Sequence, residues 1–341
     1  MVGSLETPGG AVDRITARFD WLDRLSWWRV RWGIGRMGMA VRPGLYALNA
    51  PTCESEVFVT ANYKMSLDHV RRSLGERDAW ILVLDTEGIN VWCAAGKGTF
   101  CTETLAEQII DVGLARVVTH SRLILPQLGA VGVDAGAVTA QTGFRVRYGP
   151  VRAADIPAYL DAGREASAAM RRVTFGVVER AVLVPIEIIN AGKFLIPAMA
   201  VLFILSGFFR DGFSVDRMLG QGFASVAALM AAWLGGSVLG PLLLPLLPGR
   251  MLSVKGAVAA GVALLAAQMA GALTGSGILD VIAFWLAAPA IASFVMMNFT
   301  GATPYTSPSG VRREMKLSVP VQAVAVAAAV ILWVVQRFVG A

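Results

Sequence analysis

Hydrophobic and polar positions are distributed very differently in the two halves of this chain. Up to residue 172, short apolar runs alternate with segments that contain Arg, Asp and Glu at regular intervals, as in a water-soluble protein. From Phe194 onward the charged residues nearly disappear and long apolar runs begin. Runs of about 20 apolar residues have the length that crosses the hydrocarbon core of a bilayer. The pattern therefore predicts a soluble part followed by a membrane domain.

We expect the second half to be an all-α transmembrane domain over residues 188–341, joined to the soluble part by a linker at 171–187. Pro241 and Pro245 should kink or end the second helix. The five expected helices are 188–209, 219–245, 252–273, 278–298 and 318–338.

Ionisable residues near these helices lie at their ends. Glu187 and Lys193 flank the start of the first helix, where they can extend to the interface, and Asp280 begins the fourth. A transporter is expected to show paired broken helices or an ionisable site at the bilayer midplane, and neither is evident. The membrane domain is therefore interpreted as an anchor rather than a transport path.

Lys and Arg are more frequent in the loops on the side of the soluble part than in the opposite loops. Because basic loops stay in the cytoplasm, we expect a multi-pass protein of the inner (cytoplasmic) membrane, with the soluble part in the cytoplasm and the C-terminus outside. The residues counted are Arg250, Lys255, Arg312, Arg313 and Lys316 on the first side, and Arg210, Arg217 and Arg337 on the other.

Between residues 51 and 170, apolar strand patterns alternate with amphipathic helix patterns. This alternation indicates an α/β domain with a largely parallel sheet. The spacing of Thr104 and Glu107 matches a capping box. The expected strands are 57–60, 80–84, 116–119 and 144–148, and the expected helices are 67–74, 91–97, 102–112 and one that starts at Asp155.

Residues 1–50 form a segment rich in Trp and Arg, with Trp21, Trp27, Trp28 and Trp32 among the six arginines between Arg14 and Arg36. Such a mixture suits either RNA or an anionic lipid surface. In a chain with membrane helices, packing at the lipid interface or on the α/β domain is the better interpretation. The net charge of +6 is explained by the basic residues beside the membrane helices, so no nucleic-acid partner is expected.

The segment Asn90-Val91-Trp92-Cys93-Ala94-Ala95-Gly96-Lys97 is the strongest candidate for chemistry. It follows an apolar strand and a Gly-containing turn, so that Cys93 falls in the first turn of a short helix. Free N–H groups and the helix dipole there favour a thiolate. Ala94, Ala95, Gly96 and Gly98 would leave a flat surface for a planar ligand. A buried structural cysteine is the plain alternative.

Four other kinds of site do not fit this segment. A P-loop requires Gly at 91 and Ser or Thr at 98, where the chain has Val and Gly. The two histidines, His69 and His120, and the spacing of Cys93 and Cys101 match no common zinc pattern. Three irregularly spaced cysteines are too few for an iron–sulfur cluster and make no disulfide framework. A Cys–His hydrolase has little support, which leaves a structural cysteine or a single thiolate ligand to a metal held in a macrocycle.

The octapeptide at 90–97 resembles the signature of the HgcA family, the corrinoid proteins of microbial mercury methylation. Residues 57–64, 120–129 and 144–148 resemble the same family and also the corrinoid domain of the corrinoid iron–sulfur protein of acetyl-CoA metabolism. The resemblance extends over residues 45–165, and the five expected membrane helices are similar to those of the HgcA family.

The resemblance implies a Rossmann-like domain that holds a cobalamin-type corrinoid. It implies that residues 90–97 form a cap helix below the ring and that Cys93 is the axial cobalt ligand. Residues at the strand ends are expected to contact the cofactor as well. The full set of expected cofactor-binding residues is Asn90, Val91, Trp92, Cys93, Ala94, Ala95, Gly96, Lys97, Thr60, Asn62 and Thr86.

The resemblance also implies an activity and partners. A methyl group, supplied through methyltetrahydrofolate chemistry, would be carried on cobalt and passed to Hg(II), giving methylmercury. A ferredoxin-like 4Fe–4S partner, HgcB, would reduce the cobalt, and no cluster is expected in this chain itself. Two alternatives stay open: a corrinoid methyltransferase with another acceptor, and a membrane transporter or receptor with a ligand-binding α/β domain.

Overall fold

The computed structural model describes residues 2–274, 276–299, 304–305 and 308–339. The chain divides into two compact units. One comprises residues 1–30 and 34–174 and contains the sheet, and the other comprises residues 31–33 and 175–341 and contains the long apolar helices. A mixed α/β unit followed by five apolar helices confirms the expected fold class.

The first unit is built on one seven-stranded sheet in the order β1-β2-β3-β5-β4-β6-β7. Strands β5, β4, β6 and β7 run parallel to one another, whereas β3 is antiparallel to β5 and parallel to β2. The strands are β1 (Gly3–Thr7), β2 (Gly10–Ile15), β3 (Gly44–Leu48), β4 (Val57–Ala61), β5 (Ala79–Leu84), β6 (Arg122–Leu125) and β7 (Arg145–Tyr148).

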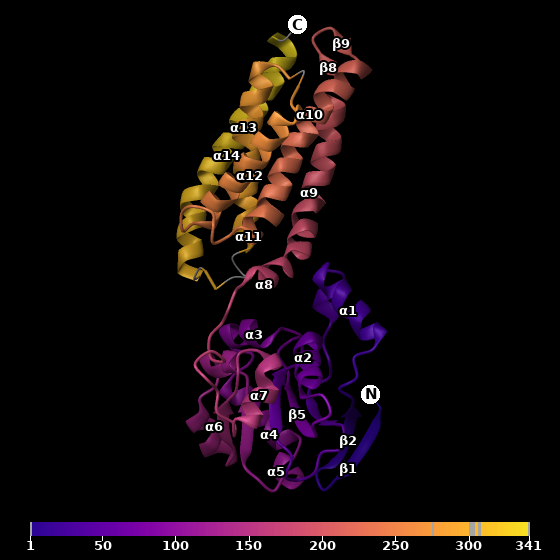
Figure 1. Ribbon diagram of the computed structural model, residues 1–341, viewed down its shortest axis with the longest axis vertical. Coiled ribbons are helices and arrows are strands. Elements are labelled where there is room, and N and C mark those ends of the chain that lie inside the picture. The colour runs from indigo at the N-terminus through magenta and orange to yellow at the C-terminus, as the bar shows by residue number, and fades with distance from the viewer. Residues whose placement is uncertain (1, 275, 300–303, 306–307, 340–341) are drawn as a thin grey trace. The chain divides into compact units, whose positions relative to one another are not determined.

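Helices cover both faces of this sheet (Figure 1). Alternate residues of β5 enter two separate cores, because successive side chains of a strand point to opposite faces. Leu82 and Leu84 pack with α3 and α4, whereas Ile81 and Val83 pack with α2 and α7. The helices of this unit are α1 (Trp21–Arg31), α2 (Lys64–Leu74), α3 (Val91–Lys97), α4 (Thr102–Asp111), α5 (Leu114–Val117), α6 (Ala135–Thr142) and α7 (Ile156–Asp161).

Two local predictions in this unit are wrong. Residues 116–119 do not form a strand, because Gly113 adopts a left-handed conformation and starts the one-turn helix α5, whose apolar residues fill the core. A short apolar run fits either kind of element. Thr104 and Glu107 do not form a capping box, because α4 begins earlier, with Cys101 at its N-cap.

The Trp- and Arg-rich segment at 1–50 is part of the sheet. Strands β1, β2 and β3 extend it beyond β5, and α1 lies between β2 and β3 in the chain. Nothing in the local pattern of residues 1–50 predicts these pairings, which join β3 to a strand more than 30 residues later.

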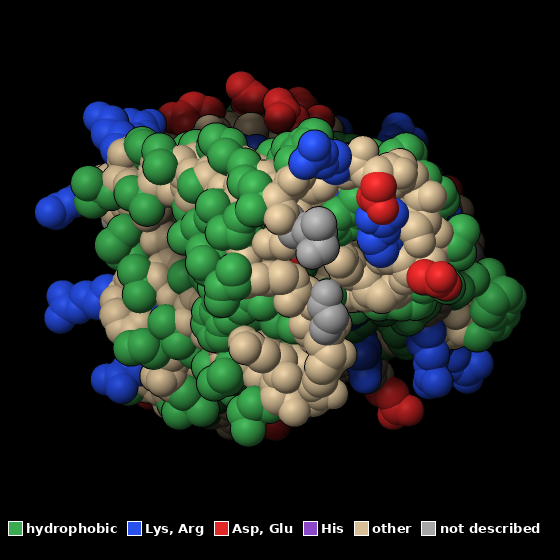
Figure 2. Space-filling view, turned by 90° about the horizontal axis from the view of Figure 1, so that it is seen from above, with side chains coloured by type: hydrophobic (Ala, Val, Ile, Leu, Met, Phe, Trp, Pro, Cys, Tyr) green, Lys and Arg blue, Asp and Glu red, His purple; other side chains and the backbone are tan. Residues whose placement is uncertain are grey.

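Among the residues that the structure describes, the second unit contains five helices long and apolar enough to cross a membrane: 177–205, 215–242, 252–269, 278–298 and 309–339. Most of the surface that faces the viewer in Figure 2 is hydrophobic side chain (green) or uncharged polar side chain and backbone (tan). The elements are α8 (Val177–Ala181), α9 (Val184–Leu205), the hairpin β8 (Phe208–Phe209) and β9 (Gly212–Phe213), α10 (Val215–Leu234), α11 (Gly240–Leu242), α12 (Leu252–Met269), α13 (Ile278–Asn298) and α14 (Pro308–Val339).

The second apolar helix ends near Pro241, as predicted. A π-helical turn, Gly235–Leu239, separates α10 from α11, and the missing N–H of Pro241 is compatible with this irregular turn. Close packing explains one glycine there, since a Cβ on Gly235 would lie 2.6 Å from Cα of Ala260.

Three ionisable side chains of this unit are more deeply placed than expected. Glu187 is buried rather than extended to the interface. Lys255, expected in a loop, is buried in α12 and donates to the carbonyl oxygen of Leu244 at 2.8 Å. Asp280 is fully buried and accepts from Arg337 at 2.8 and 3.0 Å. Pairing with a residue 57 positions away satisfies its charge.

Candidate functional site

The octapeptide lies at the carboxyl ends of the parallel strands, where α/β sheets bind ligands. Helix α3 starts directly after the loop that leaves β5, and its bounds are those predicted. The Asn90 side chain accepts a hydrogen bond from the Cys93 N–H at 3.0 Å and so caps the helix. Gly98 ends the helix with a φ of 84°. Both ends of this seven-residue helix are therefore set by the residues directly beside it in the chain, a polar cap at one end and a left-handed glycine at the other.

The loop between β5 and α3 is held by a buried polar network. The Asn62 side-chain oxygen accepts from the Thr86 N–H at 3.1 Å, the Thr86 hydroxyl at 2.8 Å and the Gly88 N–H at 2.9 Å. Its amide nitrogen donates to Asp85 at 3.0 Å. The Thr86 hydroxyl has one hydrogen, which it shares between the Asn62 oxygen and the carbonyl oxygen of Ile89 at 2.7 Å. Asn62, at the end of β4, thus positions the loop that leads to Cys93.

The two alanines of the motif face the core, not the surface. Ala94 is 0% exposed and Ala95 is 7% exposed, and both pack in the core cluster beneath α3. The prediction that both alanines and both glycines form a flat outer surface is therefore wrong for the alanines. The outer side of α3 consists of Trp92, Gly96, Gly98 and Lys97 together with the half-buried Cys93.

Helical spacing places Cys93, Gly96 and Lys97 on one side of α3. A Cβ built on Gly96 would meet no heavy atom within 4 Å, so the space above it is open. One thiol, one glycine and one ammonium group therefore share an accessible helix face next to the ends of β4 and β5.

A pocket of about 500 Å³ opens beside this helix. Its walls come from the ends of β4 and β6, from α2, from the start of α3 and from the segment after β7, and they are mostly apolar. Of the predicted site residues, Thr60, Asn90, Val91 and Trp92 line this pocket. Asn62, Thr86, Cys93 and residues 94–97 are outside its lining, among the residues that the structure describes.

Two ionisable side chains that were not predicted for the site also line the pocket. His69 reaches it from α2, with its ring centroid 4.5 Å from that of Trp27, and Arg152 reaches it from the segment after β7. Neither lies in a motif, and only the tertiary structure brings them together with Asn90. His120, by contrast, precedes β6 at the amino end of the strands and contacts the carbonyl oxygen of Ser55 at 2.9 Å. A Cys–His pair of Cys93 with His120 is therefore not supported.

Known proteins resemble the chain in the region that holds this site. Residues 14–160 match the family model described as CO dehydrogenase/acetyl-CoA synthase delta subunit. The gamma subunit of the acetyl-CoA decarbonylase/synthase complex of Archaeoglobus fulgidus is 33% identical over 128 residues, 37% of this chain and 27% of that protein. The corresponding subunit of Methanothermobacter thermautotrophicus is 34% identical over 128 residues, 37% of this chain and 28% of that protein.

A third relative bears the name of the corrinoid iron–sulfur protein. The corrinoid/iron-sulfur protein large subunit of Moorella thermoacetica is 30% identical over 148 residues, 43% of this chain and 33% of that protein. The chain thus spans a third or less of the length of these curated relatives. The predicted resemblance to the corrinoid iron–sulfur protein is confirmed, and the part of the chain that resembles the family extends from β2 to α7 and includes α3.

Proposed function

We propose that the α/β unit binds a cobalamin-type corrinoid and that Cys93 is the lower axial ligand of its cobalt. The observation that carries this proposal is a single thiol on the open face of a capped helix, at the carboxyl ends of the strands, in a region similar to a protein named for its corrinoid. A thiolate is a strong donor to metals, and the first turn of a helix favours its negative charge.

The residues around Cys93 fit a large flat group. Gly96 leaves open space one turn along the helix, and the exposed Lys97 ammonium can donate to the amide side chains of a corrinoid. Asn90 fixes the backbone at Cys93, and Trp92 extends the same exposed surface. The apolar pocket lined by Thr60 and Val91 has room for one substituent of the ligand. When bound, the corrinoid supplies a metal centre that accepts and releases a methyl group.

We further propose Hg(II) as the methyl acceptor and methylmercury as the product. The octapeptide and the five-helix membrane domain together support this assignment, since both resemble the HgcA family. Hg(II) is an electrophile, so the methyl group must reach it as a carbanion equivalent or as a radical. The Cys93 thiolate, as an anionic donor, would favour transfer in that direction. The same donor makes reduction of the metal harder, which suits a strongly reducing ferredoxin-like 4Fe–4S partner such as HgcB and a methyl supply from methyltetrahydrofolate.

We propose that the membrane unit anchors the protein in the cytoplasmic membrane, with the α/β unit in the cytoplasm and the C-terminus outside. The excess of Lys and Arg on the side of the α/β unit supports this orientation. Lys255 is buried in α12, and Arg312, Arg313 and Lys316 lie at the start of α14 rather than in a loop. The bias therefore depends on Arg250 before α12 and on these three residues at a helix end.

Replacement of the thiol tests the proposed site. Cys93→Ala should abolish methylmercury formation and shift the visible absorption spectrum of the bound corrinoid, because the sulfur ligand is lost. Cys101→Ala is the matched control, since Cys101 is a half-buried free thiol at the N-cap of α4, and it should leave the spectrum and the activity unchanged. Unchanged activity in Cys93→Ala would contradict the proposed role of this residue.

A corrinoid methyl carrier with another acceptor is the second candidate, favoured by the relatives named as acetyl-CoA decarbonylase/synthase subunits. Methyl transfer assays that offer Hg(II) or a thiol acceptor to the same methylated protein distinguish the two. Cobalt analysis of the purified chain distinguishes both from a transporter or receptor with an unrelated ligand.

A further inference from the structure

Helix α1 exposes an apolar stripe on the surface of the α/β unit. Positions 21, 25 and 28 follow the i, i+4, i+7 spacing of one helix face, and residue 22 lies beside them. Trp27 and Val30 lie on the opposite face and are buried. The exposed fractions are 68% for Trp21, 55% for Leu22, 43% for Leu25 and 55% for Trp28.

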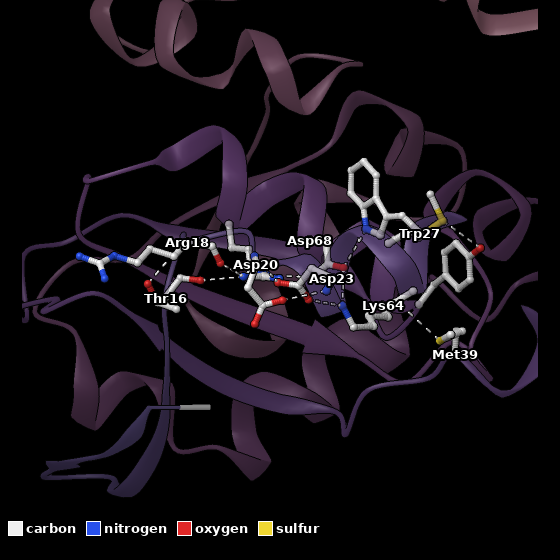
Figure 3. A network of polar contacts seen from close by, with 12 residues as sticks. Thr16, Arg18, Asp20, Asp23, Trp27, Met39, Lys64 and Asp68 are labelled. Carbon is white, nitrogen blue, oxygen red and sulfur yellow. Dashed lines mark hydrogen bonds and ion pairs between the residues drawn. The ribbon is translucent and has the colours of Figure 1, made fainter. Parts of the chain in front are cut away.

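This orientation of α1 is held by a network of charged groups (Figure 3). Asp23 accepts from Lys64 at 2.9 Å and from Arg71 at 2.6 Å. The indole N–H of Trp27 donates to Asp68 at 2.9 Å, and Asp68 also accepts from Lys64 at 2.6 Å and from Arg71 at 2.8 Å. Because these contacts fix α1 on α2, the helix cannot turn its apolar stripe inward without breaking them.

Cationic side chains flank the stripe. Arg24 and Arg29 are exposed, and at 100° per residue they fall on opposite sides of the row formed by positions 21, 25 and 28. Of the acidic residues of this region, Asp23 is engaged with Lys64 and Arg71. The exposed side of α1 therefore combines large apolar groups, two of them tryptophans, with positive charge at the edges.

We propose that α1 is an interfacial anchor whose exposed stripe lies in the headgroup region of an anionic lipid bilayer. Tryptophan prefers the membrane–water interface, and an amphipathic helix with flanking arginines binds anionic lipid through apolar burial and charge attraction. The chain carries its own apolar helices of membrane-spanning length, so the α/β unit is covalently tethered to any bilayer that these helices enter. The tether raises the effective concentration of the lipid surface for even a weak interfacial helix.

The anchor would act on the same unit that holds the pocket. The ring of Trp27, on the buried face of α1, packs in a tilted arrangement against His69 of α2, which lines that pocket, with the ring centroids 4.5 Å apart. A lipid surface that holds α1 therefore also holds one wall of the pocket. A protein partner is the other surface that an exposed Trp stripe could meet, and the experiment distinguishes the two.

Site-specific photocrosslinking tests this proposal on the full chain in lipid nanodiscs. The photoreactive residue p-benzoylphenylalanine is introduced at Leu25, in the stripe, and in a separate protein at Ile110, which is 64% exposed on α4. In phosphatidylglycerol discs we expect the Leu25 protein to give several times more lipid adduct by mass spectrometry than the Ile110 protein. In phosphatidylcholine discs or at high salt the difference should shrink, because the arginine attraction is lost.

Removal of the flanking charges provides a second readout. The double substitution Arg24→Gln and Arg29→Gln is made in the protein with the photoreactive residue at position 25. It should lower the yield of lipid adduct in phosphatidylglycerol discs several-fold, while the melting temperature of the protein is unchanged. Equal lipid adducts at Leu25 and Ile110, or adducts at Leu25 to protein alone, would overturn the proposal. The readout requires no corrinoid, so its failure would leave the proposed function untouched.

Discussion

At the scale of single residues, the site depends on a few short-range contacts around one thiol. Asn90 caps the helix at the Cys93 N–H, and Gly96 keeps the space beside the thiol open. Asn62 directly follows β4 and holds the loop after β5 through one oxygen, which accepts from the N–H groups of Thr86 and Gly88 and lies 2.8 Å from the Thr86 hydroxyl. This geometry gives Asn62 and Thr86 a positioning role, and a direct contact of either with a cofactor stays a prediction.

Asn62→Asp is expected to lower the stability of the cofactor-free protein by about 3 kcal/mol. The substitution keeps the shape and the acceptor oxygen, but it replaces the donor to Asp85 by a second carboxylate oxygen. Thermal unfolding of the full chain in detergent measures the change. Gln141→Glu, the same chemical change on the exposed side of α6, is the control and should shift stability by less than about 0.5 kcal/mol. Unchanged stability together with weaker corrinoid binding would instead assign Asn62 a direct contact.

At the scale of elements, the short helix α3 is stabilised by its caps and by packing, because an isolated helix of this length does not form in water. Helix α2 has a wider role, since its residues line the pocket on one side and bind the charged groups of α1 on another. The network of Asp23, Asp68, Lys64 and Arg71 therefore links the Trp-rich segment to the wall of the site.

The network predicts a pH-dependent difference between the protein and Asp23→Asn. Burial by itself raises the pKa of Asp23, but hydrogen bonds from Lys64 and Arg71 and their charges lower it below its ordinary value. A lowered carboxyl pKa stabilises the folded state above the unfolded value of about 3.9, and this stabilisation is lost as the pH falls through the lowered pKa. We expect Asp23→Asn to cost about 2 kcal/mol at pH 7 and the two unfolding curves to converge at acidic pH.

Melting temperatures of both proteins between pH 3 and pH 7 check this expectation. Asp161→Asn serves as the comparison, because the Asp161–Arg77 pair is exposed and such surface pairs contribute about 0–1 kcal/mol. A constant difference between protein and Asp23→Asn over the whole pH range would show that the charge of Asp23 does not contribute to this stability.

At the scale of the whole molecule, the predicted site lies within one compact unit. The residues of α3, the Asn62 network and the pocket all belong to residues 1–30 and 34–174. In the membrane unit, Asp280 forms an ion pair with Arg337, and Lys255 donates to the carbonyl oxygens of Leu244 and Leu247. These charged groups therefore have their partners within their own unit.

A chain that ends after Thr174 is accordingly expected to bind corrinoid with the visible spectrum of the full-length protein. Reconstitution with the cofactor followed by cobalt analysis and absorption spectroscopy measures this. A folded truncated protein that fails to retain cobalt would place part of the site in the membrane unit and would contradict the role of that unit as an anchor.

Much of the fold near the site could be predicted from local patterns. The bounds of α3 follow from Asn90 and Gly98, a polar cap and a left-handed glycine on either side of a short helix. Strand β5 and the apolar helices are predicted because burial on both faces or in lipid leaves long apolar runs. The prediction of a strand at 116–119 was wrong for the same reason, since a buried apolar turn and a buried strand have the same local composition.

What the sequence by itself determined is therefore local: the division into a soluble and an apolar half, the helix that carries Cys93, and the candidate thiol. What only the tertiary structure decided depends on residues distant in the chain. Pairing of β3 with β5 brings residues 1–50 into the sheet, Asn62 reaches across to Thr86, and Arg337 neutralises Asp280. Ala94 and Ala95 are buried in the core, and His69 and Arg152 both line the pocket. Hydrogen bonds, ion pairs and burial act through space, and no local periodicity records which distant partner satisfies a polar group.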